Sequence, residues 1–426
     1  MRITINAFGS RGDVQPYVAL GKGFKEAGHD VRLTTHRIFE ALVLEHNLDF
    51  FPMEGDPRQV LLAQAVAELG NNPFRVNRWI AENFKPALKE VFHATLDAAQ
   101  GADLLLNSAL SFAGWHVAQK LDIPSIGAYL QPTMPTRAFH NYSAPLPPSW
   151  LPFKGLYNVL STKLTNQSFF YMLRPPVNAC RREVLDLPPL SAAYYWRLDS
   201  ASATVPIIYG YSPSVIPRPP DWGDYQQITG YWFLDGAQNY EPPAELADFL
   251  ESGPPPVYVG FGSMVDHERE DMTRLVVEAM GQAGQRAILL SGWSDLGSAV
   301  LPDFILRIDF VPHDWLFPRV AAVVHHGGAG TTAAGLRAGV PNVVIPFFAD
   351  QPFWGWRVHK LAVGPKWILR KKLTAAKLAA AIRQAVNDST MIQRAEELGK
   401  RIRAEDGVRT AVQLVEQQLP ENKSSG

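Results

Sequence analysis

The stretch FVPHDWLFPRVAAVVHHGGAGTTAAGLRAGVPNVVIPFFADQ, residues 310–351, decides the fold. Its apolar run from Val320 to Val324 predicts a buried strand, His325 to Gly330 a turn, and Thr331 to Ala338 a helix. A strand, a glycine turn and a helix start bind anions in that order, because free backbone N–H groups and the positive end of the helix dipole face the ligand. The stretch therefore predicts a diphosphate-binding turn in an α/β sheet.

Side chains around this turn add hydrogen-bonding groups suited to a nucleotide-linked sugar. Neighbouring strand residues point in opposite directions, so we expect His326 to serve the diphosphate and His325 to be structural. A satisfied core histidine is the alternative for His326. Asp350 and Gln351 follow the next apolar strand and offer a carboxylate and an amide to sugar hydroxyls. The expected diphosphate contacts are His326, Gly327, Gly328, Ala329, Gly330 and Thr331.

Composition limits the class of protein. The chain has 426 residues, 46% of them hydrophobic and 19% charged, which is a globular composition with room for two domains. A formal net charge of −1 argues against a nucleic-acid partner. Cys180 is the only cysteine, which excludes an intrachain disulfide and a thiolate metal cluster. The amino-terminal residues lack the apolar core of a signal peptide, so a soluble, cytoplasmic protein is expected.

Strands and helices alternate along the chain, which predicts parallel, doubly wound sheets. We expect an amino-terminal domain over residues 1–235, a linker over 236–256, a carboxy-terminal domain over 257–400, and a helix and tail over 401–426 that pack back on the first domain. Each domain begins with a strand, a glycine turn and a helix. Open parallel sheets bind ligands at the carboxyl ends of their strands, so the predicted fold is α/β, with two Rossmann-like domains facing across a cleft.

Prolines and aromatic residues mark the second part of the first domain. Most of the 34 prolines lie between Pro132 and Pro256, which predicts extended loops rather than long helices. Within this region we expect one aromatic helix, which contains Phe169, Phe170 and Tyr171. Aromatic and apolar residues in this region either pack against the domain or line an apolar pocket, and both interpretations stay open. The pocket candidates are Met134, Phe139, Trp150 and Phe170.

The first glycine turn carries a second candidate group. A dinucleotide fingerprint beginning at Gly9 would need glycine at Arg11 and Val14, so NAD binding is not expected. Asp13 is either the cap of a helix beginning at Val14 or a general base at the end of the first strand. Ser10 lies in the same turn and is a candidate contact to the donor.

Further donor contacts are weaker. Gly262 and Ser263 repeat the strand-to-glycine arrangement, while Phe310, Val311 and Trp293 are candidates to hold a base or to pack in the core. Metal-ligand spacings such as HExxH are missing from this region, so helix dipole and imidazole must neutralise the diphosphate. We predict activity without a metal ion or any other cofactor.

These motifs resemble a known family. GSRGDVQPYVALGKGFKEAGHDVRLTTH, residues 9–36, is similar to the amino-terminal part of sterol 3-β-glucosyltransferases and, more distantly, of glycopeptide-antibiotic glycosyltransferases. VPHDWLFPRVAAVVHHGGAGTTAAGLRAGVP and PFFADQPFWG resemble their donor-binding signature. The resemblance covers nearly the whole chain and implies a family 1 glycosyltransferase with the GT-B fold.

The resemblance also implies roles for single residues. Asp13 stands where this branch has its catalytic aspartate, and Asp350 with Gln351 stand where the donor sugar is held. Phe310 takes the place of a tryptophan that stacks on the base. Ala334 stands where plant members have a glutamate for the ribose hydroxyls, which leaves the choice between uridine and thymidine donors open.

The expected activity is inverting transfer of a sugar from a nucleotide donor to a hydroxyl of a hydrophobic acceptor such as a sterol or triterpenoid. UDP-glucose is the expected donor and a TDP-sugar its alternative. A sterol acceptor would bring the protein to a membrane surface, although no polybasic or strongly amphipathic anchor stands out in the sequence. A nucleotide-sugar 2-epimerase and a non-catalytic nucleotide-sugar-binding protein are the two alternatives.

Overall fold

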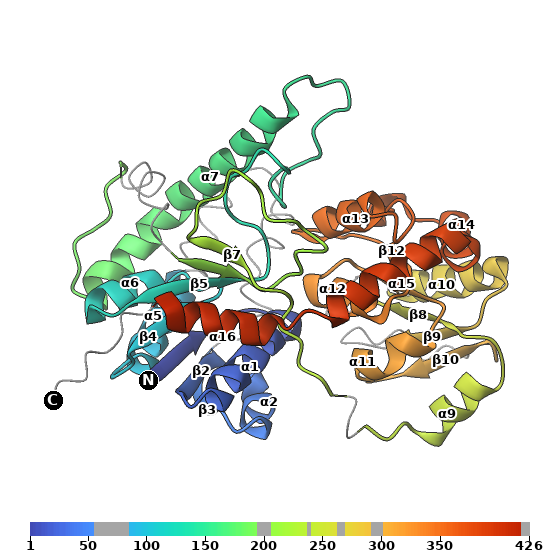
Figure 1. The fold of residues 1–426 in the computed structure, drawn as a ribbon, viewed down its shortest axis with the longest axis horizontal. Helices are drawn as coiled ribbons and strands as arrows, with labels where there is room; N and C mark the ends of the chain where they lie inside the picture. Colours follow the sequence, from blue (N-terminus) through green and yellow to red (C-terminus); the bar gives the residue numbers. More distant parts are fainter. Residues whose placement is uncertain (55–84, 194–205, 237–239, 262–268, 291–300, 419–426) are drawn as a thin grey trace. The chain divides into compact units, whose positions relative to one another are not determined.

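The computed structural model describes residues 1–54, 85–193, 206–236, 240–261, 269–290 and 301–418. The chain divides into two units, unit 1 made of Met1–Leu234 with Asp406–Gly426, and unit 2 made of Asp235–Glu405. Each unit is built around one parallel sheet, and Figure 1 follows the chain through both. The prediction of an α/β fold with two parallel-sheet domains is confirmed.

Unit 1 contains a seven-stranded sheet in the order β3-β2-β1-β4-β5-β6-β7, with every neighbouring pair parallel. Chain order reverses between β1 and β4, where Asn6 lies opposite Asn107, and doubly wound sheets bind ligands at such a switch point. The turn after β1 is therefore well placed for a site. The strands are β1 (Arg2–Asn6), β2 (Asp30–His36), β3 (Asp49–Met53), β4 (Leu104–Asn107), β5 (Ser125–Tyr129), β6 (Ile207–Tyr209) and β7 (Gln226–Ile228).

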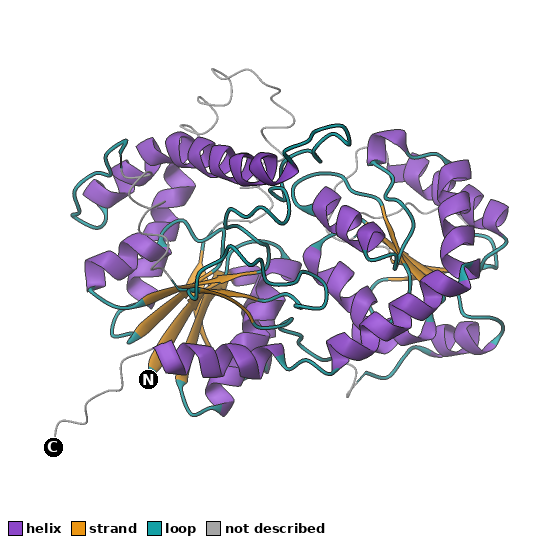
Figure 2. Ribbon diagram, turned by 45° about the horizontal axis from the view of Figure 1, so that its top comes forward, coloured by secondary structure: helices purple, strands orange, loops and turns teal. Residues whose placement is uncertain are grey.

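Helices cover both faces of this sheet (Figure 2). One face packs against α1 and α16, and the other against α5, α6 and α7. Because Val412 and Val415 of α16 are buried against α1, the end of the chain belongs to unit 1. The helices are α1 (Arg11–Glu26), the 3-10 turn η1 (Arg37–Phe39), α2 (Glu40–Glu45), α5 (Lys85–Ala98), α6 (Gly114–Leu121), α7 (Lys154–Glu183) and α16 (Gly407–Gln418).

Two expectations about these helices are wrong. Helix α1 begins at Arg11 rather than Val14, because Ser10 is its N-cap and Asp13 lies in its first turn. The expected aromatic helix around Phe170 is present, but α7 is a helix of 30 residues that contains Pro175 and Pro176, where loops rather than a long helix were expected. A proline inside a helix costs about 3 kcal/mol. The second half of α7 offsets this cost by burying Leu173, Val177 and Cys180 in the core.

Unit 2 contains a five-stranded parallel sheet in the order β10-β9-β8-β11-β12. Chain order reverses between β8 and β11, and Gly260 lies opposite His325 at the carboxyl ends of these strands. The strands are β8 (Val257–Gly260), β9 (Ala287–Leu290), β10 (Ile305–Ile308), β11 (Ala322–His325) and β12 (Asn342–Val344).

The helices of unit 2 sort onto the two faces of its sheet. Val257 and Val259 pack with α10 and α14, whereas Tyr258 points to the opposite face and packs with α9. Helix α9 lies inside the segment expected as a linker, and its Leu246 is buried, so this segment is part of unit 2. The helices are α9 (Ala244–Glu251), α10 (Arg269–Ala283), α11 (His313–Leu316), η4 (Phe317–Arg319), α12 (Ala329–Ala338), α13 (Gln351–Lys360), η5 (Arg370–Lys372), α14 (Ala375–Asn387) and α15 (Ser389–Arg403).

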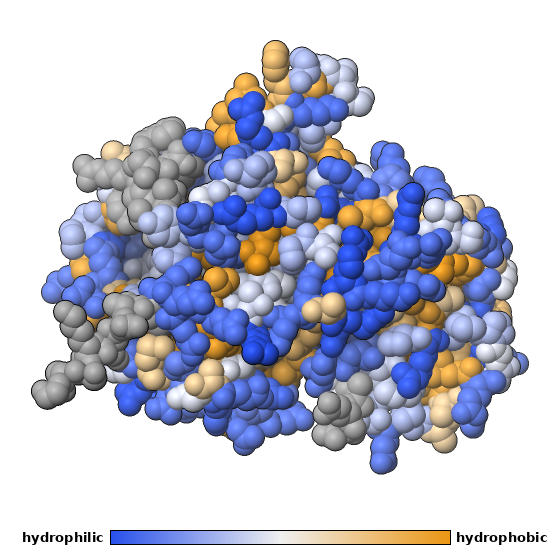
Figure 3. Space-filling view, in the orientation of Figure 1, coloured by the Kyte–Doolittle hydropathy of each residue, from blue (hydrophilic) through white to orange (hydrophobic). Residues whose placement is uncertain are grey.

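Hydrophilic side chains dominate the face drawn in Figure 3, with orange apolar patches between them. Among the described residues, none of the helices has both the length and the apolarity needed to cross a bilayer.

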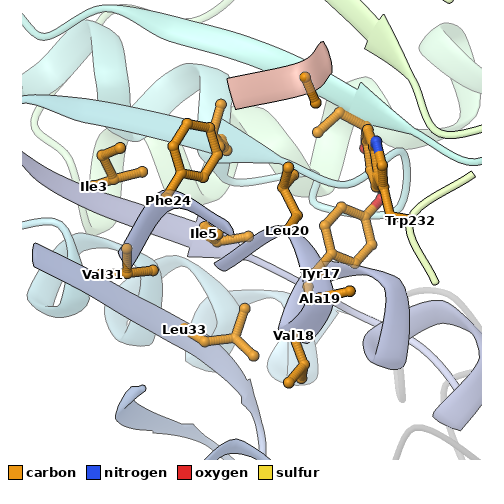
Figure 4. Close-up of a cluster of buried hydrophobic side chains, with 14 of the residues drawn as sticks. Ile3, Ile5, Tyr17, Val18, Ala19, Leu20, Phe24, Val31, Leu33 and Trp232 are labelled. Atoms are coloured by element: carbon orange, nitrogen blue, oxygen red, sulfur yellow. The ribbon is translucent and has the colours of Figure 1, made fainter. Parts of the chain in front are cut away.

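The core beneath α1 supports the first candidate site. Figure 4 shows Leu20 and Phe24 of α1 in one buried cluster with Ile3 and Ile5 of β1, and Tyr17 beside Trp232. Tyr17 also meets the indole of Trp232 edge to face, with 5.8 Å between ring centroids. Burial of each such side chain stabilises the fold by about 1.5–3 kcal/mol. Helix α1, which carries the first candidate site in its first turn, therefore packs on a buried apolar core.

Candidate functional site

The candidate site of unit 1 is the turn between β1 and α1. One carboxylate oxygen of Asp13, Oδ2, accepts hydrogen bonds from the backbone N–H of Ser10 at 2.9 Å and from its hydroxyl at 2.8 Å. The Oδ1 atom accepts none from the residues that the structure describes. Ser10 therefore holds one oxygen of Asp13 in place and leaves the other without a hydrogen bond from the described residues.

Gly9 makes this arrangement possible. Its φ of 132° lies in the region that favours glycine, and a Cβ at this position would come within 2.6 Å of Oδ2 of Asp13. Any side chain at Gly9 would displace the carboxylate. The glycine turn thus fixes the position of Asp13 as well as the path of the backbone.

The surroundings of Asp13 make its carboxylate more basic. Burial raises the pKa of Asp13 above its ordinary value of 3.8, against the opposing effect of the two Ser10 hydrogen bonds. Tyr17, one helical turn further on, contributes to this apolar surrounding, and its hydroxyl donates to the carbonyl of Ala128 at 2.6 Å rather than to Asp13. Asp13 has the two properties of a general base, a raised pKa and an oxygen that accepts no hydrogen bond within the described chain.

The candidate site of unit 2 is the turn between β11 and α12. Helix α12 has Gly328 as its N-cap, and the first helical hydrogen bond runs from the N–H of Thr332 to the carbonyl of Gly328 at 3.0 Å. The N–H groups of Ala329, Gly330 and Thr331 precede that bond and have no partner inside the helix. They form an amide cluster of the kind that can bind an anion.

Gly327 brings this turn close to the loop before α13. Its φ is 93°, and a Cβ would lie 2.7 Å from Cγ1 of Val344 and 3.0 Å from the carbonyl of Gln351. Glycine is required here both for the backbone conformation and for the close approach of the two segments. The two parts of the predicted donor site are therefore packed together within unit 2.

The two adjacent histidines have different environments, as the sequence indicated. His325 is completely buried, and its Nδ1 accepts the N–H of Gly327 at 3.1 Å. Its Nε2 must then carry the proton and donate to Oδ1 of Asn342 at 3.0 Å. Burial lowers the pKa of His325 to about 3, so this histidine is a neutral structural residue.

His326 is half-buried and its ring lies beside the amide cluster. A Cβ added to Gly328 would be 2.5 Å from Nε2 of His326, which places that nitrogen over the start of α12. Its Nδ1 is buried and makes no hydrogen bond with any described residue. Burial, and then the neighbouring His313, lower the pKa of His326 to about 4, so the ring is neutral at neutral pH.

The two threonines of the turn have separate roles. Thr332 is buried, and its hydroxyl donates to the carbonyl of Gly328 at 2.8 Å, which strengthens the start of α12. Thr331 is half-buried and belongs to the amide cluster. Of the two hydroxyls considered from the sequence, that of Thr331 is the better candidate for a ligand.

Asp350 and Gln351 are held in place by the residues around them. Oε1 of Gln351 accepts the N–H groups of Phe347 and Phe348 at 2.8 and 3.2 Å, which ties down the preceding loop. Oδ2 of Asp350 accepts the indole N–H of the buried Trp354 at 2.8 Å. Ala349 between loop and helix has a left-handed φ of 54°, a strained conformation that is common at binding sites. Asp350 is thereby fixed at the start of α13.

The remaining candidates for donor binding differ in their exposure to solvent. Phe310 is 56% exposed, as a ring that stacks on a base would be, whereas Val311 is buried in the core. Gly262, Ser263 and Trp293 lie outside the described residues. Within the parts of the chain that the structure describes, no group of three His, Cys, Asp or Glu side chains could hold a metal ion.

The four acceptor candidates lie in different environments of unit 1. Phe139 is buried and meets Trp222 edge to face at 6.2 Å. Met134 and Phe170 are half-buried, and Phe170 packs edge to face on Tyr171 at 5.5 Å. Trp150 is 78% exposed just before α7. The four side chains therefore differ in how far each is exposed.

Two residues missed in the sequence support the candidate carboxylates. Tyr17 follows Asp13 by four residues and Trp354 follows Asp350 by four, so each aromatic ring lies one helical turn behind its carboxylate. The spacing was visible in GSRGDVQPY and in ADQPFW. It could be interpreted only once the start of each helix was known.

Comparisons with known proteins now identify the family. The model of the glycosyltransferase family 28 N-terminal domain matches residues 3–140, and that of the erythromycin biosynthesis protein CIII-like C-terminal domain matches residues 278–417. The sterol 3-beta-glucosyltransferase UGT80A2 of Arabidopsis thaliana is 39% identical over 436 positions, which cover 100% of this chain and 67% of the plant protein. The chain belongs to the sterol 3-beta-glucosyltransferase family. The resemblance found in the sequence is thus confirmed.

The family also contains much longer proteins. The sterol 3-beta-glucosyltransferase of Aspergillus fumigatus is 40% identical over 433 positions, which cover 98% of this chain but 30% of the fungal protein. The chain therefore spans less than a third of the length of the fungal relatives it matches.

Solved structures share the fold. The glycosyltransferase of kitacinnamycin matches with a TM-score of 0.69 and 21% identity over 98% of this chain and 99% of its own. The Streptomyces glycosyltransferase SsfS6, solved with thymidine diphosphate, matches with a TM-score of 0.59 and 20% identity over 98% and 99%. Both have the GT-B fold of glycosyltransferases, which this chain shares.

Proposed function

We propose that this protein transfers glucose from UDP-glucose to a hydroxyl of a hydrophobic alcohol such as a sterol, with inversion at the anomeric carbon. The observation that carries the proposal is Asp13, a carboxylate with a raised pKa and one oxygen held by Ser10, in a chain 39% identical to a sterol 3-beta-glucosyltransferase over its whole length. A carboxylate prepared in this way suits removal of a proton from an alcohol.

In the proposed reaction, Oδ1 of Asp13 takes the proton of the acceptor hydroxyl as its oxygen attacks the anomeric carbon. The new glycosidic bond forms while the bond from that carbon to the diphosphate oxygen breaks, and UDP leaves with the bonding electrons. A single displacement of this kind converts an α-linked donor into a β-glycoside. Asp13 belongs to unit 1 and the diphosphate turn to unit 2, so the reaction requires both units.

The turn before α12 is proposed to stabilise the leaving diphosphate. The amides of Ala329, Gly330 and Thr331 point where negative charge grows, and the neutral ring of His326 adds an N–H. Removing one such donor costs roughly 2.7–4 kcal/mol of activation free energy. Asp350 and Gln351 are proposed to orient the sugar. We expect transfer to continue in EDTA, since this arrangement needs no cation.

Phe310 is proposed to stack on the uracil ring. For the acceptor, we propose that Met134 and Phe170 line the apolar pocket, because both are half-buried. Phe139 would support that pocket from the core, and Trp150, which is mostly exposed, would lie at its edge.

A mass-spectrometric matrix of donors against acceptors tests the proposal. UDP-glucose, UDP-galactose and TDP-glucose would each be incubated with a sterol, a flavonoid and a macrolide, and without acceptor. We expect the largest yield of a monoglucoside from UDP-glucose with the sterol. A changed donor sugar in the acceptor-free sample would instead indicate an epimerase, and an absence of product with every pair would refute the proposal.

A further inference from the structure

Helix α7 has an inverted distribution of polar and apolar residues in its first half. Its side facing unit 1 buries the polar Asn158 and Thr162, and the amide of Asn158 donates to the carbonyl of Arg137 at 2.9 Å. Its opposite side exposes leucines. A surface helix of a water-soluble protein normally does the reverse, with apolar residues inward. The outward apolar side therefore requires an explanation outside the core of unit 1.

The exposed residues form one continuous stripe. They follow one another at intervals of three, four, four and seven residues, which places them on a single side of the helix. We call this set the outer stripe: Phe153 (71% exposed), Leu156 (52%), Leu160 (44%), Leu164 (59%) and Tyr171 (40%). Trp150, 78% exposed, extends it beyond the start of the helix. Single exposed apolar residues are ordinary, but a contiguous row marks a contact surface.

The figures agree with this placement. In Figure 1 the beginning of α7 and the loop before it extend away from the sheet of unit 1. Figure 3 shows orange apolar atoms gathered on the same projecting segment. The outer stripe is thus carried on a part of unit 1 that reaches out from its core.

The segment that carries the stripe has charged side chains of one sign only. Residues 123–182 contain no Asp or Glu, although the chain as a whole has 41 acidic residues and a formal net charge of −1. The same segment carries six cationic side chains: Arg137, Lys154, Lys163, Arg174, Arg181 and Arg182. Arg181 is buried, so five remain for the surface. Lys163 and Arg174 follow Leu160 and Tyr171 by three residues, so they flank the stripe.

We propose that α7 docks on an anionic lipid bilayer, with the outer stripe in the interface and the flanking cations at the headgroups. Leucine and aromatic residues on one side with lysine and arginine beside them are the features of a helix that lies in a membrane surface. A second copy of this chain would meet the same cations and repel them, whereas anionic headgroups attract them. This inference goes beyond the proposed function and does not depend on it.

Flotation with extruded vesicles tests the docking. The full chain is expected to float with phosphatidylcholine containing phosphatidylserine and far less with phosphatidylcholine alone. The double variant Leu160→Ser/Leu164→Ser should weaken binding about thirtyfold, because two roughly half-exposed leucines are lost. Its matched control is Ile38→Ser/Leu44→Ser, since these residues of unit 1 are 51% and 52% exposed on other helices. Equal binding of the two variants would overturn the inference.

Two charge-reversal variants and a fluorescence measurement complete the test. Lys154→Glu should weaken binding to the anionic vesicles at least fivefold, while Lys120→Glu on α6 should not. Brominated lipid should quench the emission of Trp150, and Trp150→Phe should remove that part of the quenching. Quenching that persists unchanged in Trp150→Phe would contradict docking through this segment. A dimer that the double leucine variant dissociates, with vesicle binding unaltered, would show that a second copy covers the stripe instead.

The transfer assay distinguishes failure of this inference from failure of the proposed function. A chain that binds vesicles but glycosylates nothing refutes the function and leaves the docking intact. A chain that glycosylates a dissolved sterol but ignores anionic vesicles refutes the docking alone.

Discussion

Substitution of Ser10 by alanine tests whether Ser10 tunes the ionisation of Asp13 or only caps helix α1. The change removes the hydroxyl that donates to Oδ2 of Asp13 at 2.8 Å and keeps the backbone N–H that donates at 2.9 Å. A hydrogen bond to an ionised acceptor lowers that group's pKa, so its loss must raise the pKa of Asp13 further. Because Asp13 acts as a base only when ionised, the acid limb of the rate profile should move to higher pH.

The size of the effect follows from the same contacts. Hydrogen bonds to charged groups are worth about 1.5–3 kcal/mol. The lower end applies here, because Asp13 is only half-buried and one donor remains. About 1.4 kcal/mol corresponds to a factor of ten. We therefore expect kcat/KM to fall about tenfold on the acid limb and to stay near its original value on the plateau. The assay is kcat/KM for UDP-glucose and a sterol across the pH range.

Thr374→Ala is the matched control for lost helix capping. Its side chain accepts the N–H of Lys377 at the start of α14, in unit 2, so the variant should lose about 1 kcal/mol of stability without moving the acid limb. If the acid limb of kcat/KM is unchanged in Ser10→Ala and stability falls as in Thr374→Ala, then Ser10 acts only as a helix cap. A tenfold fall at every pH would show that Ser10 acts on something other than the ionisation of Asp13.

Three further predictions concern the two candidate sites. Asp13→Asn should abolish transfer yet raise the melting temperature near neutral pH. The pKa of Asp13 is higher in the folded than in the unfolded protein, so the ionised carboxylate destabilises the fold once the pH has risen through the folded value. A less stable variant would contradict the raised pKa. Binding of UDP should raise the pKa of His326 from about 4, since an anion favours the protonated ring, and NMR titration with and without UDP measures it. A pKa unmoved by UDP would remove His326 from the diphosphate site. Gly327→Ala should cost at least about 1–2 kcal/mol of unfolding free energy from its φ of 93° and weaken UDP in calorimetry, whereas Gly284→Ala, with a φ of 65° and open space around its Cβ, should lower stability but leave UDP affinity unchanged.

The donor turn could be predicted from the sequence because its parts are local. A buried apolar run, three glycines and a helix start within 19 residues specify strand, turn and helix without knowledge of any distant contact. The different environments of His325 and His326 also followed from strand alternation. The family resemblance rests on the same continuous motifs.

The features that were missed depend on contacts or burial that sequence patterns do not contain. The start of α1 was misplaced because the bonds between Ser10 and Asp13 add a turn before the apolar periodicity begins. The length of α7 was not predicted because Pro175 and Pro176 normally end a helix, and only burial of its second half in the core allows it to continue. The outer stripe was hidden for a related reason, since a leucine does not reveal from sequence which way it faces.

Asp13 and Asp350 share one local arrangement but differ in the donors around their carboxylates. Each lies at the start of a helix, and each has an aromatic residue four positions later. Trp354 donates its indole N–H to Asp350, which holds one carboxylate oxygen in place. Tyr17 donates its hydroxyl to the carbonyl of Ala128 instead, so it supplies no hydrogen bond to Asp13. We therefore propose that the first carboxylate acts as a base and the second as a sugar ligand, and that the direction of the aromatic donor contributes to this difference. Exchanging the aromatic partner, as in Tyr17→Trp, should disturb catalysis far more than binding of UDP-glucose.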